Sequence, residues 1–524
     1  MPHPGAAPDA RRAPLWLRRS RLVAFGCGAL AATGLAPLAL WPLALAGFAG
    51  LFVLARAAAT PRAAAWIGWA GGSGYFLLAL NWIVEPFLVD IARHGWMAPF
   101  ALPLLAAGLA LFWAAAMAAA RALGGGALAW TATLVAAELA RSYVFTGFPW
   151  ALIGHGLIAA PAVQLAALAG PHALSALMLV GAVGLAALAL GQRGRAVAAL
   201  ALFGLAQAGG LWLAARPLPA PADGAGDAAA VIRLIQPNAP QHEKWDETMA
   251  PVFFRRQVAF TAAPPLNGAP RPDLVIWPET AIPLLLNEAD AVLQIVAEAA
   301  AGPPVVIGMN RVEGTRIYNA AIRLDTAQGQ AAVGAIYDKH HLVPFGEYMP
   351  FGDALARIGI HGLAASAGRG FSAGPGPQLM TLPGVGQALP LICYEAVFPR
   401  HARAPGGARP RMLLQITNDA WFGRFSGPYQ HLAQARLRAV EQGLPMVRVA
   451  NTGVSAMIDA RGRITGQIAL GQAGWLDVAL PPAAPPTPYG QSGDWPVLAL
   501  LALVLMWLAG RAARQSLNLR KNGD

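Results

Sequence analysis

The hydrophobic pattern divides the chain into two kinds of sequence. Residues 1–216 contain several apolar runs near or above about 20 residues, the length that crosses a lipid bilayer as a helix. Residues 217–490 instead carry short apolar segments separated by charged residues, glycine and proline. One further apolar run lies near residues 495–511. The pattern therefore predicts a helical membrane region, a polar domain and a last membrane helix.

We predict about eight membrane-spanning helices, about seven of them in a domain over residues 1–216. The first two apolar runs share only the short break "APLALWP", so their separation into two helices is the least defined part of this count. A basic start and the letters "ALAA" make a signal peptide the alternative for the first run, but its direct continuation into a second span favours a retained helix. The predicted spans are 22–36, 38–57, 64–84, 96–118, 126–146, 160–190, 194–215 and 495–511.

Short strands and helices alternate in the polar domain, which we place at residues 230–480. "VIRLIQ", "DLVIWPE", "PVVIGMN", "PLICYE", "MLLQITND" and "MVRVANT" are typical of buried strands, and 247–262, 287–301 and 428–442 of helices. This alternation predicts a layered α/β domain. Connectors rich in proline, glycine and alanine flank it at 217–229 and 481–494, and a basic tail, 512–524, follows the last helix.

Composition supports the membrane assignment. Hydrophobic residues make up 56% of the chain and charged residues 12%, against roughly 45–50% and 25% in soluble proteins. The net charge of +12 includes arginines just before the first apolar run and just after the last, which favours contact with anionic lipid. No basic stripe with interleaved aromatic residues is present, so we expect no nucleic-acid partner.

The arginines also predict an orientation, because positively charged loops stay in the cytoplasm. A cytoplasmic N-terminus puts every arginine-bearing loop of the membrane region on the cytoplasmic side. Seven crossings then place residue 217 outside the cytoplasm, and an eighth returns the basic C-terminus to it. The arginines concerned are Arg56, Arg62, Arg121, Arg193 and Arg195.

Three predicted strands end on residues that could do chemistry. Glu279 follows "DLVIWP", Lys339 follows "IYD", and Cys393 follows "LPLI". Loops at strand ends often present functional side chains. A thiol needs a base before it attacks a carbonyl, and a fixed cation stabilises the oxyanion that forms. Taken separately, however, Cys393 also fits a buried inert thiol, and the two charged residues fit solvated rim positions.

Several neighbouring residues carry further hypotheses. Glu347, eight residues after Lys339, could orient that lysine or share its proton handling. His340 and His341 suggest a metal, but adjacent strand residues point to opposite faces, so we expect no metal site. Trp245 could simply cap the helix that follows it. The two cysteines, Cys27 and Cys393, are expected in different regions, which makes a disulfide between them improbable.

Read together, the motifs "WPET", "YDKHHLVPFGEYMP", "ICYE" and "ITNDAWFG" resemble the nitrilase superfamily, which uses a Glu–Lys–Cys triad in an αββα sandwich. Nearly the whole chain resembles the bacterial apolipoprotein N-acyltransferase family. The additional motifs are "TGFPW" at 146–150, "QPNAPQHEKWDE" at 236–247 and "TPYGQSGDW" at 487–495. This resemblance implies a nitrilase-like sandwich outside the cytoplasm, attached to a polytopic helical bundle.

The resemblance implies roles residue by residue. Glu279 would be the general base, Lys339 the oxyanion stabiliser and Cys393 the nucleophile. Glu347, Tyr394 and Glu395 match supporting positions, and Trp245 matches a tryptophan implicated in substrate handling. From composition we add a lid of aromatic and apolar side chains that excludes water, with Phe345, Tyr348, Met349, Trp421, Phe422 and Phe425 as its candidates.

The implied reaction is a ping-pong acyl transfer in the bacterial inner membrane. Cys393 would take an acyl chain from a phospholipid and pass it to the N-terminal amine of a diacylglyceryl apolipoprotein. No cofactor is expected, and a monomer is favoured. Two alternatives remain on the residues alone: a membrane-tethered amidase with the same triad, and a polytopic transporter or scaffold with an inactive sandwich. A variant of the first reading keeps the chemistry and changes the acceptor.

Overall fold

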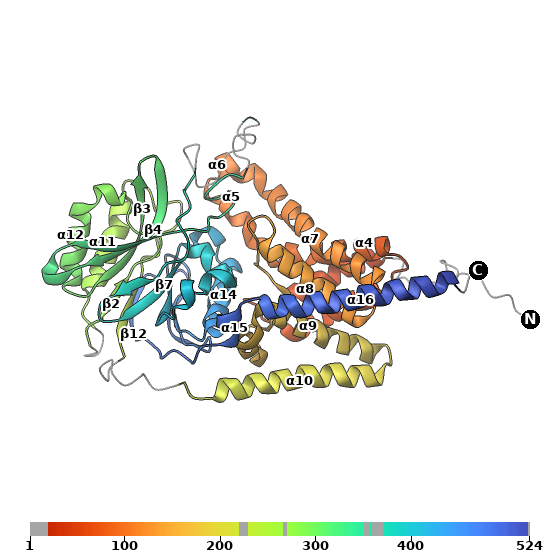
Figure 1. The fold of residues 1–524 in the computed structure, drawn as a ribbon. Helices are drawn as coiled ribbons and strands as arrows, with labels where there is room; N and C mark the ends of the chain where they lie inside the picture. Colours follow the sequence, from red (N-terminus) through yellow and green to blue (C-terminus); the bar gives the residue numbers. More distant parts are fainter. Residues whose placement is uncertain (1–18, 219–228, 266–269, 351–356, 358–369, 522–524) are drawn as a thin grey trace, which may run out of the picture.

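The computed structural model describes residues 19–218, 229–265, 270–350, 357 and 370–521. Most of the predicted 217–229 connector and the first arginines of the chain lie outside the described residues, as do 351–356 and 358–369 of the 351–388 loop, whose lipid contacts the sequence does not predict. Figure 1 shows a bundle of long helices on one side of the molecule and a layered α/β domain on the other.

The helical region contains an apolar helix for each predicted span. In chain order these are α2 (Ser20–Ala32), α3 (Trp41–Ala57), α4 (Pro61–Ala79), α7 (Ala98–Ala122), α8 (Ala127–Tyr143), α9 (Ala166–Ala189), α10 (Arg193–Ala215) and α16 (Trp495–Lys521). Short helical turns connect them: η2 (Asn81–Val84), α5 (Glu85–Val89), α6 (Ile91–His94), η3 (Gly95–Met97), η4 (Ile153–Leu157) and η5 (Pro161–Leu165).

Not all of these helices are long enough to cross a bilayer by themselves. Among the described residues, four helical segments combine sufficient length and hydropathy: Ile91–Ala122, Pro161–Ala189, Arg193–Ala215 and Trp495–Asn518. The pair Pro61–Ala79 and Asn81–Val89, bent by 66°, passes the same test if it is counted as one span. The helices Ser20–Ala32 and Trp41–Ala57 are shorter and apolar.

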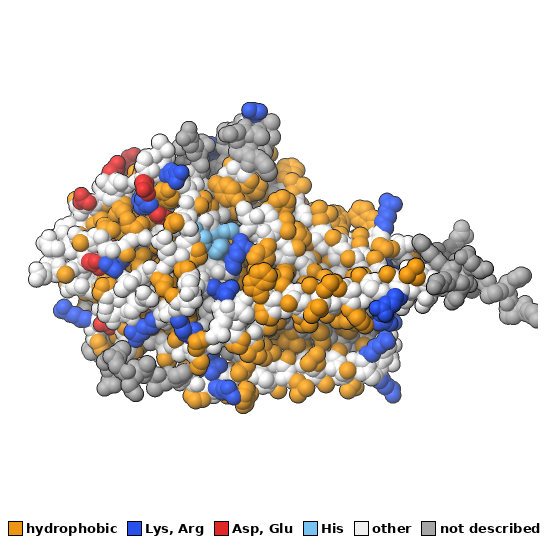
Figure 2. Space-filling view, viewed as in Figure 1, with side chains coloured by type: hydrophobic (Ala, Val, Ile, Leu, Met, Phe, Trp, Pro, Cys, Tyr) orange, Lys and Arg blue, Asp and Glu red, His pale blue; other side chains and the backbone are white. Residues whose placement is uncertain are grey.

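Small residues let the first helices pack closely. A Cβ on Gly28 of α2 would lie 1.8 Å from the Gly71 carbonyl oxygen of α4. A Cβ on Gly68 of α4 would lie 2.5 Å from the Trp113 carbonyl oxygen of α7. Helices in membranes associate through such close backbone approach, because lipid provides no hydrophobic drive between them. Apolar side chains are frequent on the face of the bundle that Figure 2 shows.

Two six-stranded sheets form the α/β domain. The first has the order β12-β1-β2-β3-β4-β5 and the second the order β11-β10-β9-β8-β7-β6. The strands of the first are β1 (Val231–Gln236), β2 (Leu274–Ile276), β3 (Val305–Glu313), β4 (Arg316–Asp325), β5 (Ala332–Asp338) and β12 (Gly474–Ala479). Those of the second are β6 (Met380–Leu382), β7 (Gly386–Ile392), β8 (Met412–Thr417), β9 (Met446–Ala450), β10 (Ser455–Ile458) and β11 (Ile464–Ile468).

The sheets are parallel at their centres, where the buried strands predicted from sequence lie. β1, β2 and β3 run parallel in one sheet, and β7, β8 and β9 in the other. Short helical turns lie in the loops that follow the strands: η7 (Leu286–Glu288), η8 (Ala327–Gly329), η9 (Cys393–Val397), η10 (Pro399–Ala402), η11 (Pro405–Gly407) and η12 (Asp419–Phe422). The prediction of a layered α/β domain is confirmed.

Three apolar cores hold the layers together. Side chains from both sheets, such as Ile232 of β1 and Val447 of β9, form the core between them. Helices α11 (Ala250–Ala262) and α12 (Asp290–Ala300) cover the outer face of the first sheet. Helix α14 (Gly427–Gln442) covers the outer face of the second. The order helix, sheet, sheet, helix is the one the resemblance implied.

A buried ion pair shapes the surface of the helical bundle that meets the second sheet. Arg141 Nη2 lies 3.1 Å from Glu138 Oε1 on α8. Arg141 also donates to the Phe148 and Trp150 carbonyls, at 2.6 and 2.7 Å, and Glu138 Oε2 accepts from the Ile153 amide at 2.7 Å. The pair therefore holds the segment from Phe148 to Ile153 in place, and Trp113 of α7 also donates to Glu138 Oε1, at 3.2 Å. A buried charge pair whose contacts all lie within the fold serves structure rather than transport.

Candidate active site

The three strand ends singled out from sequence meet at one place. Glu279 follows β2, Lys339 follows β5 and Cys393 follows β7, so the first two come from one sheet and the third from the other. All three side chains are buried. The antiparallel return of β3 and β4 brings β5 beside them at the sheet edge. Because the site is shared by two sheets, its geometry depends on the order of the strands in each sheet. The separation of these residues along the sequence does not reveal that order.

The Lys339 ammonium lies between two carboxylates. Its Nζ is 2.7 Å from Glu347 Oε1 and 3.5 Å from Glu279 Oε1. Asn319 of β4 bridges the same two acids, with Nδ2 donating to Glu279 Oε1 at 2.7 Å and to Glu347 Oε1 at 3.4 Å. The Val343 amide donates to Glu347 Oε2 at 2.8 Å. The two acids and the cation thus form one network with fixed geometry.

Burial alone would lower the pKa of Lys339, but the attraction of Glu347 and Glu279 outweighs it and raises that pKa. The pKa of Glu347 is raised, because burial outweighs the opposing effect of Lys339. Lys339 therefore stays an ammonium at neutral pH. A permanently charged donor in a site closed to water is well suited to stabilise an oxyanion.

Glu279 is held through its side chain and its backbone. The Asn418 amide donates to Glu279 Oε2 at 2.8 Å. Lys244 Nζ donates to the Glu279 carbonyl at 3.1 Å and to Thr280 Oγ1 at 2.8 Å. Thr280 has a φ of 46°, in the left-handed region that costs a non-glycine residue energy. Burial lowers the pKa of Lys244 to about 8, against the attraction of Glu279.

Cys393 is the first residue of η9 and stands in the strained turn directly after β7. Its φ is 51°, again in the left-handed region. A strand that turns sharply into a helix projects its side chain away from both elements, as nucleophiles in other folds require. Burial and the Glu279 carboxylate raise the pKa of Cys393, although Lys339 opposes them. The resting sulfur is therefore a neutral thiol.

Glu395 connects the turn that carries Cys393 to the segment that carries Lys339. Its Oε2 accepts from the Ile392 amide at 2.7 Å and from Tyr337 Oη at 3.0 Å. Its Oε1 accepts from the His340 amide at 2.8 Å and the His341 amide at 3.2 Å. Burial would raise the pKa of Glu395, but hydrogen bonding and attraction from His340 lower it. One carboxylate thus sets the spacing of two strand ends.

Tyr394 faces the helical bundle. Its hydroxyl lies 3.5 Å from the Gly147 carbonyl in the "TGFPW" loop, and its ring packs against Phe398 and His341, with centroids 4.9 and 5.7 Å apart. Arg400 donates to the Ser142 carbonyl at 2.9 Å from the same side. The residue after the candidate nucleophile therefore anchors the sandwich to the bundle.

The expectation that His340 and His341 face opposite sides is wrong. β5 ends at Asp338, so strand alternation no longer applies to them. His340 Nε2 lies 3.0 Å from His401 Nδ1, and the rings of His341 and His401 are 4.8 Å apart. Burial, followed by the charges of His340, His341 and Arg400, lowers the pKa of His401 to about 2. No group of metal-binding geometry occurs in the part of the chain that the structure describes.

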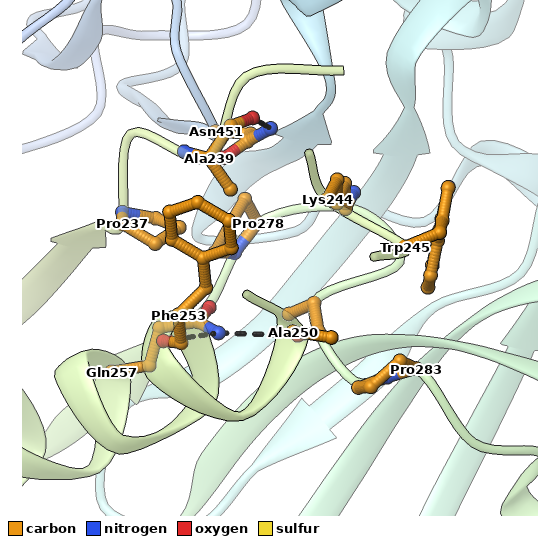
Figure 3. A pocket seen from close by; sticks show the side chains of 11 residues that line it. Pro237, Ala239, Lys244, Trp245, Ala250, Phe253, Gln257, Pro278, Pro283 and Asn451 are labelled. Atoms are coloured by element: carbon orange, nitrogen blue, oxygen red, sulfur yellow. Dashed lines mark hydrogen bonds between the residues drawn. The ribbon is translucent and has the colours of Figure 1, made fainter. Parts of the chain in front are cut away.

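Trp245 lines a pocket together with Pro278, the residue before Glu279. Pro237, Lys244 and Phe253 also line this pocket, and Figure 3 shows the Phe253 ring beside Pro237 and Pro278. Trp245 is 46% exposed, with Lys244 Nζ 5.1 Å from its ring centroid. The tryptophan thus contacts the lysine that holds the Glu279 backbone.

The candidate lid residues occupy different environments. Phe422 packs into an aromatic cluster with Trp82 and Trp150 of the bundle, at centroid distances of 4.8 and 5.6 Å. Phe345 is 53% exposed and has a φ of 65°. Phe425 is exposed, and Tyr348, Met349 and Trp421 are intermediate. Phe422 joins the two regions, and Phe345 stands free beside the Glu347 loop.

Several residues of the site cannot be recognised from the sequence pattern. Asn319 lies mid-strand, and Gln415 and His431, which lie 3.2 and 3.1 Å from the Cys393 carbonyl, look like ordinary polar positions. Lys244 had a usable signal, because the chain contains so few lysines and one of them adjoins Trp245.

Comparisons with known proteins match both regions. Residues 27–184 match the apolipoprotein N-acyltransferase N-terminal domain, and residues 257–484 match the carbon-nitrogen hydrolase family. Among solved structures, an amidase from Nesterenkonia sp. is 21% identical, with a TM-score of 0.36, over 52% of this chain and 96% of that one.

Full-length relatives extend this match. A protein of Allorhizobium ampelinum called apolipoprotein N-acyltransferase is 39% identical over 508 residues, 92% of this chain and 94% of that protein. One of the same name from Caulobacter vibrioides is 39% identical over 484 residues, 88% of each chain. A third, from Brucella melitensis, is 38% identical over 514 residues, 93% of this chain and 94% of that protein. This chain therefore belongs to the apolipoprotein N-acyltransferase family, with a carbon-nitrogen hydrolase domain in its second half.

Proposed function

We propose that this protein transfers a fatty acyl chain from a membrane phospholipid to the N-terminal α-amine of diacylglyceryl-cysteine on apolipoproteins. The single observation that carries the proposal is the arrangement of Lys339 between Glu279 and Glu347, beside the strained turn of Cys393. Relatives named for this activity supply the acceptor class. The site supplies a nucleophile, a base and an oxyanion stabiliser.

In the first step, Glu279 takes the proton of the Cys393 thiol while the sulfur attacks the phospholipid ester carbonyl. The Lys339 ammonium stabilises the oxyanion that forms. Collapse of this intermediate breaks the ester bond, and the departing glycerol oxygen takes the proton from Glu279. The products are a lysophospholipid and a Cys393 thioester. The raised pKa of Cys393 supports a base that acts during attack, because a resting thiolate is disfavoured there.

In the second step, the neutral α-amine of the acceptor attacks the thioester. Lys339 again faces the oxyanion, and Glu279 accepts the proton that the amine loses. Collapse expels the Cys393 sulfur, which takes that proton back from Glu279. The acceptor leaves as an N-acylated lipoprotein, and the enzyme returns to its starting state. The lysophospholipid leaves before the acceptor reacts with the acyl-enzyme, which makes the mechanism ping-pong.

Membrane placement fits both lipid substrates. Loops between helices α3 and α4, α7 and α8, and α9 and α10 lie at one end of the bundle, because Arg56 and Arg195 both donate to Gln192 and Arg121 donates to the Ala58 carbonyl. Basic side chains gather at this end in Figure 2, away from the sandwich. The positive-inside rule makes that end cytoplasmic, so we place the sandwich on the periplasmic side of the inner membrane.

We further propose that the chain crosses the bilayer eight times, with α2 (13 residues), α3 and α8 (17 residues each) as its short crossings. The proposed functional domains are 1–216, 230–480 and 495–511, with both termini in the cytoplasm. The exposed apolar side chains along α16, including Leu500, Leu503, Met506 and Trp507, support a lipid-facing helix. Every catalytic residue named here comes from one chain, which supports action as a monomer.

Intact-mass analysis of protein purified from membranes tests the proposal. We expect a fatty-acyl adduct on the wild type, its loss in Cys393→Ser, and its transfer to a diacylglyceryl peptide on addition of that acceptor. Hydrolysis of a small amide without transfer from phospholipid would favour the tethered amidase instead. An adduct that persists in Cys393→Ser would overturn the nucleophile.

A further inference from the structure

A closed ring of hydrogen bonds lies beneath the candidate nucleophile. Arg448 of β9 donates through Nη1 to Gln415 Oε1 of β8 at 2.7 Å, and through Nη2 to Asp419 Oδ2 of η12. Asp419 Oδ1 lies 2.9 Å from His431 Nδ1 of α14. His431 Nε2 closes the ring at 3.0 Å from Gln415 Nε2. All four side chains are fully buried.

The chemistry of the four groups determines where each hydrogen lies. Arginine only donates, so the Gln415 atom facing Arg448 is the carbonyl and its NH2 group points the other way. Burial would raise the pKa of Asp419, but Arg448 and His431 lower it to about 2, so this side chain is a carboxylate. It accepts the Nδ1 hydrogen of His431. Burial and Arg448 lower the pKa of His431, which leaves the imidazole neutral.

A neutral His431 that donates from Nδ1 has a lone pair on Nε2. This Nε2 lies 3.0 Å from Gln415 Nε2 and 3.1 Å from the Cys393 carbonyl oxygen, and of these two neighbours only the Gln415 NH2 group is a donor. That lone pair accepts one hydrogen of the Gln415 NH2 group. The second hydrogen then points to the Cys393 carbonyl oxygen, 3.2 Å from Gln415 Nε2. Every hydrogen-bonding atom of the Gln415 side chain is used, and its rotation about the terminal bond is locked. Buried networks with all members paired specify a single geometry.

The carbonyl that receives this bond belongs to a strained residue. Cys393 has a φ of 51°, and a non-glycine residue keeps such a conformation only where its surroundings over-determine it. A change of backbone angle at Cys393 would rotate both its carbonyl and its side chain. A donor fixed against the carbonyl therefore also fixes the direction of the sulfur.

We infer that Gln415 is a positioning residue for the Cys393 sulfur and that His431 acts through Gln415 by fixing its amide. Neither touches the acyl carbonyl. The inference rests on the proposed function, because it assumes that Cys393 is the nucleophile. It accounts for a buried histidine and arginine that the acyl-transfer steps do not use.

Three variants of the full-length protein in detergent and phospholipid test this inference. Gln415→Met removes the donor at similar volume, and His431→Phe keeps a ring against Trp150 and Phe422, both 5.6 Å away. The third is their combination. The matched control is Gln236→Met in β1 of the other sheet. The Gln236 side chain is also fully buried, its Nε2 donates to the Ala469 and Gln472 carbonyls, and its Oε1 accepts from the Ser455 amide. If Gln415→Met does not fold, Gln415→Glu takes its place. A glutamate carboxylate still accepts the hydrogen bond from Arg448 but has no NH2 group to donate to the Cys393 carbonyl.

The readout is the rate of adduct formation on Cys393 by intact mass, per folded molecule, at several phospholipid concentrations. We expect Gln415→Met to slow acylation about tenfold at saturating phospholipid with an unchanged half-saturating concentration. The combined variant should be no slower than Gln415→Met alone, because the contact of His431 with Gln415 acts only on the hydrogen bond to the Cys393 carbonyl, which Gln415→Met already removes. Gln236→Met should lower the melting temperature without slowing acylation of the folded fraction.

A wild-type acylation rate in Gln415→Met, or an equal loss in Gln236→Met, would overturn the positioning role. Multiplicative losses in the combined variant would overturn the part given to His431. Absence of any adduct on the wild type, or its persistence in Cys393→Ser, would instead overturn the proposed function itself. The two failures are therefore distinguishable in one series of measurements.

Discussion

Lys339 Nζ lies 0.8 Å closer to Glu347 than to Glu279, at 2.7 Å against 3.5 Å. The lysine is therefore paired mainly with the acid that the mechanism does not use as a base. Asn319 donates to both acids and keeps them apart. In the proposed mechanism, Glu347 thus neutralises Lys339 and Glu279 remains free to accept a proton.

Glu347→Gln should slow acylation by about 100-fold, because Lys339 would move to Glu279 and occupy the base. The half-saturating phospholipid concentration should change little, since neither Glu347 nor Lys339 is proposed to bind the acyl chain. Single-turnover acylation followed by intact mass measures both quantities. Glu313→Gln, which removes an acid that is 67% exposed and paired with Arg311, is the control. Equal rates in Glu347→Gln and wild type would remove this role from Glu347.

Glu279→Gln should make the Cys393 thiol easier to deprotonate while abolishing acyl transfer. Burial and the Glu279 carboxylate raise the pKa of Cys393, so removing the second cause lowers that pKa. The rate of alkylation by iodoacetamide as a function of pH should shift to lower pH in the variant. Glu298→Gln, on the exposed side of α12, should leave the profile unchanged. An unshifted profile in Glu279→Gln would contradict the electrostatic contact.

Glu395→Gln should destabilise the sandwich by about 3 kcal/mol at neutral pH, because four donors lose a charged acceptor. The pKa of Glu395 is lowered in the folded protein from an ordinary value of 4.5. Its contribution is therefore present above about pH 4.5 and is lost as the pH falls through the folded value. Melting temperatures of variant and wild type should converge in acid. A gap independent of pH would show that the charge does not matter.

Phe345→Ala should raise the share of acyl-enzyme lost to hydrolysis without lowering the melting temperature, because the ring is largely exposed. Phe422→Ala, in contrast, should lower the stability of the protein by about 2 kcal/mol, because the Phe422 ring packs against Trp82, Trp150 and His431. Free fatty acid released per acyl transferred measures the first effect. An unchanged ratio in Phe345→Ala would remove that residue from the lid.

The sequence by itself determined the local features of this protein. Apolar runs of bilayer length predicted the helices, and short buried runs predicted the central parallel strands, because both patterns depend on neighbouring residues. Glu279 and Cys393 follow two of those strands, and Lys339 follows the antiparallel edge strand β5. All three stand in motifs that are read without knowing the fold. Strand ends and reactive side chains are properties of single segments.

Only the tertiary structure decided which polar residues act on those three. Asn319 bridges two acids, Gln415 faces the Cys393 carbonyl, and His340 and His341 turn toward a common neighbour. Each of these contacts joins segments far apart in the chain. Their geometry follows from the order of the strands in two sheets and from the residue at which a strand ends. The hydrophobic pattern of a single segment predicts neither of these.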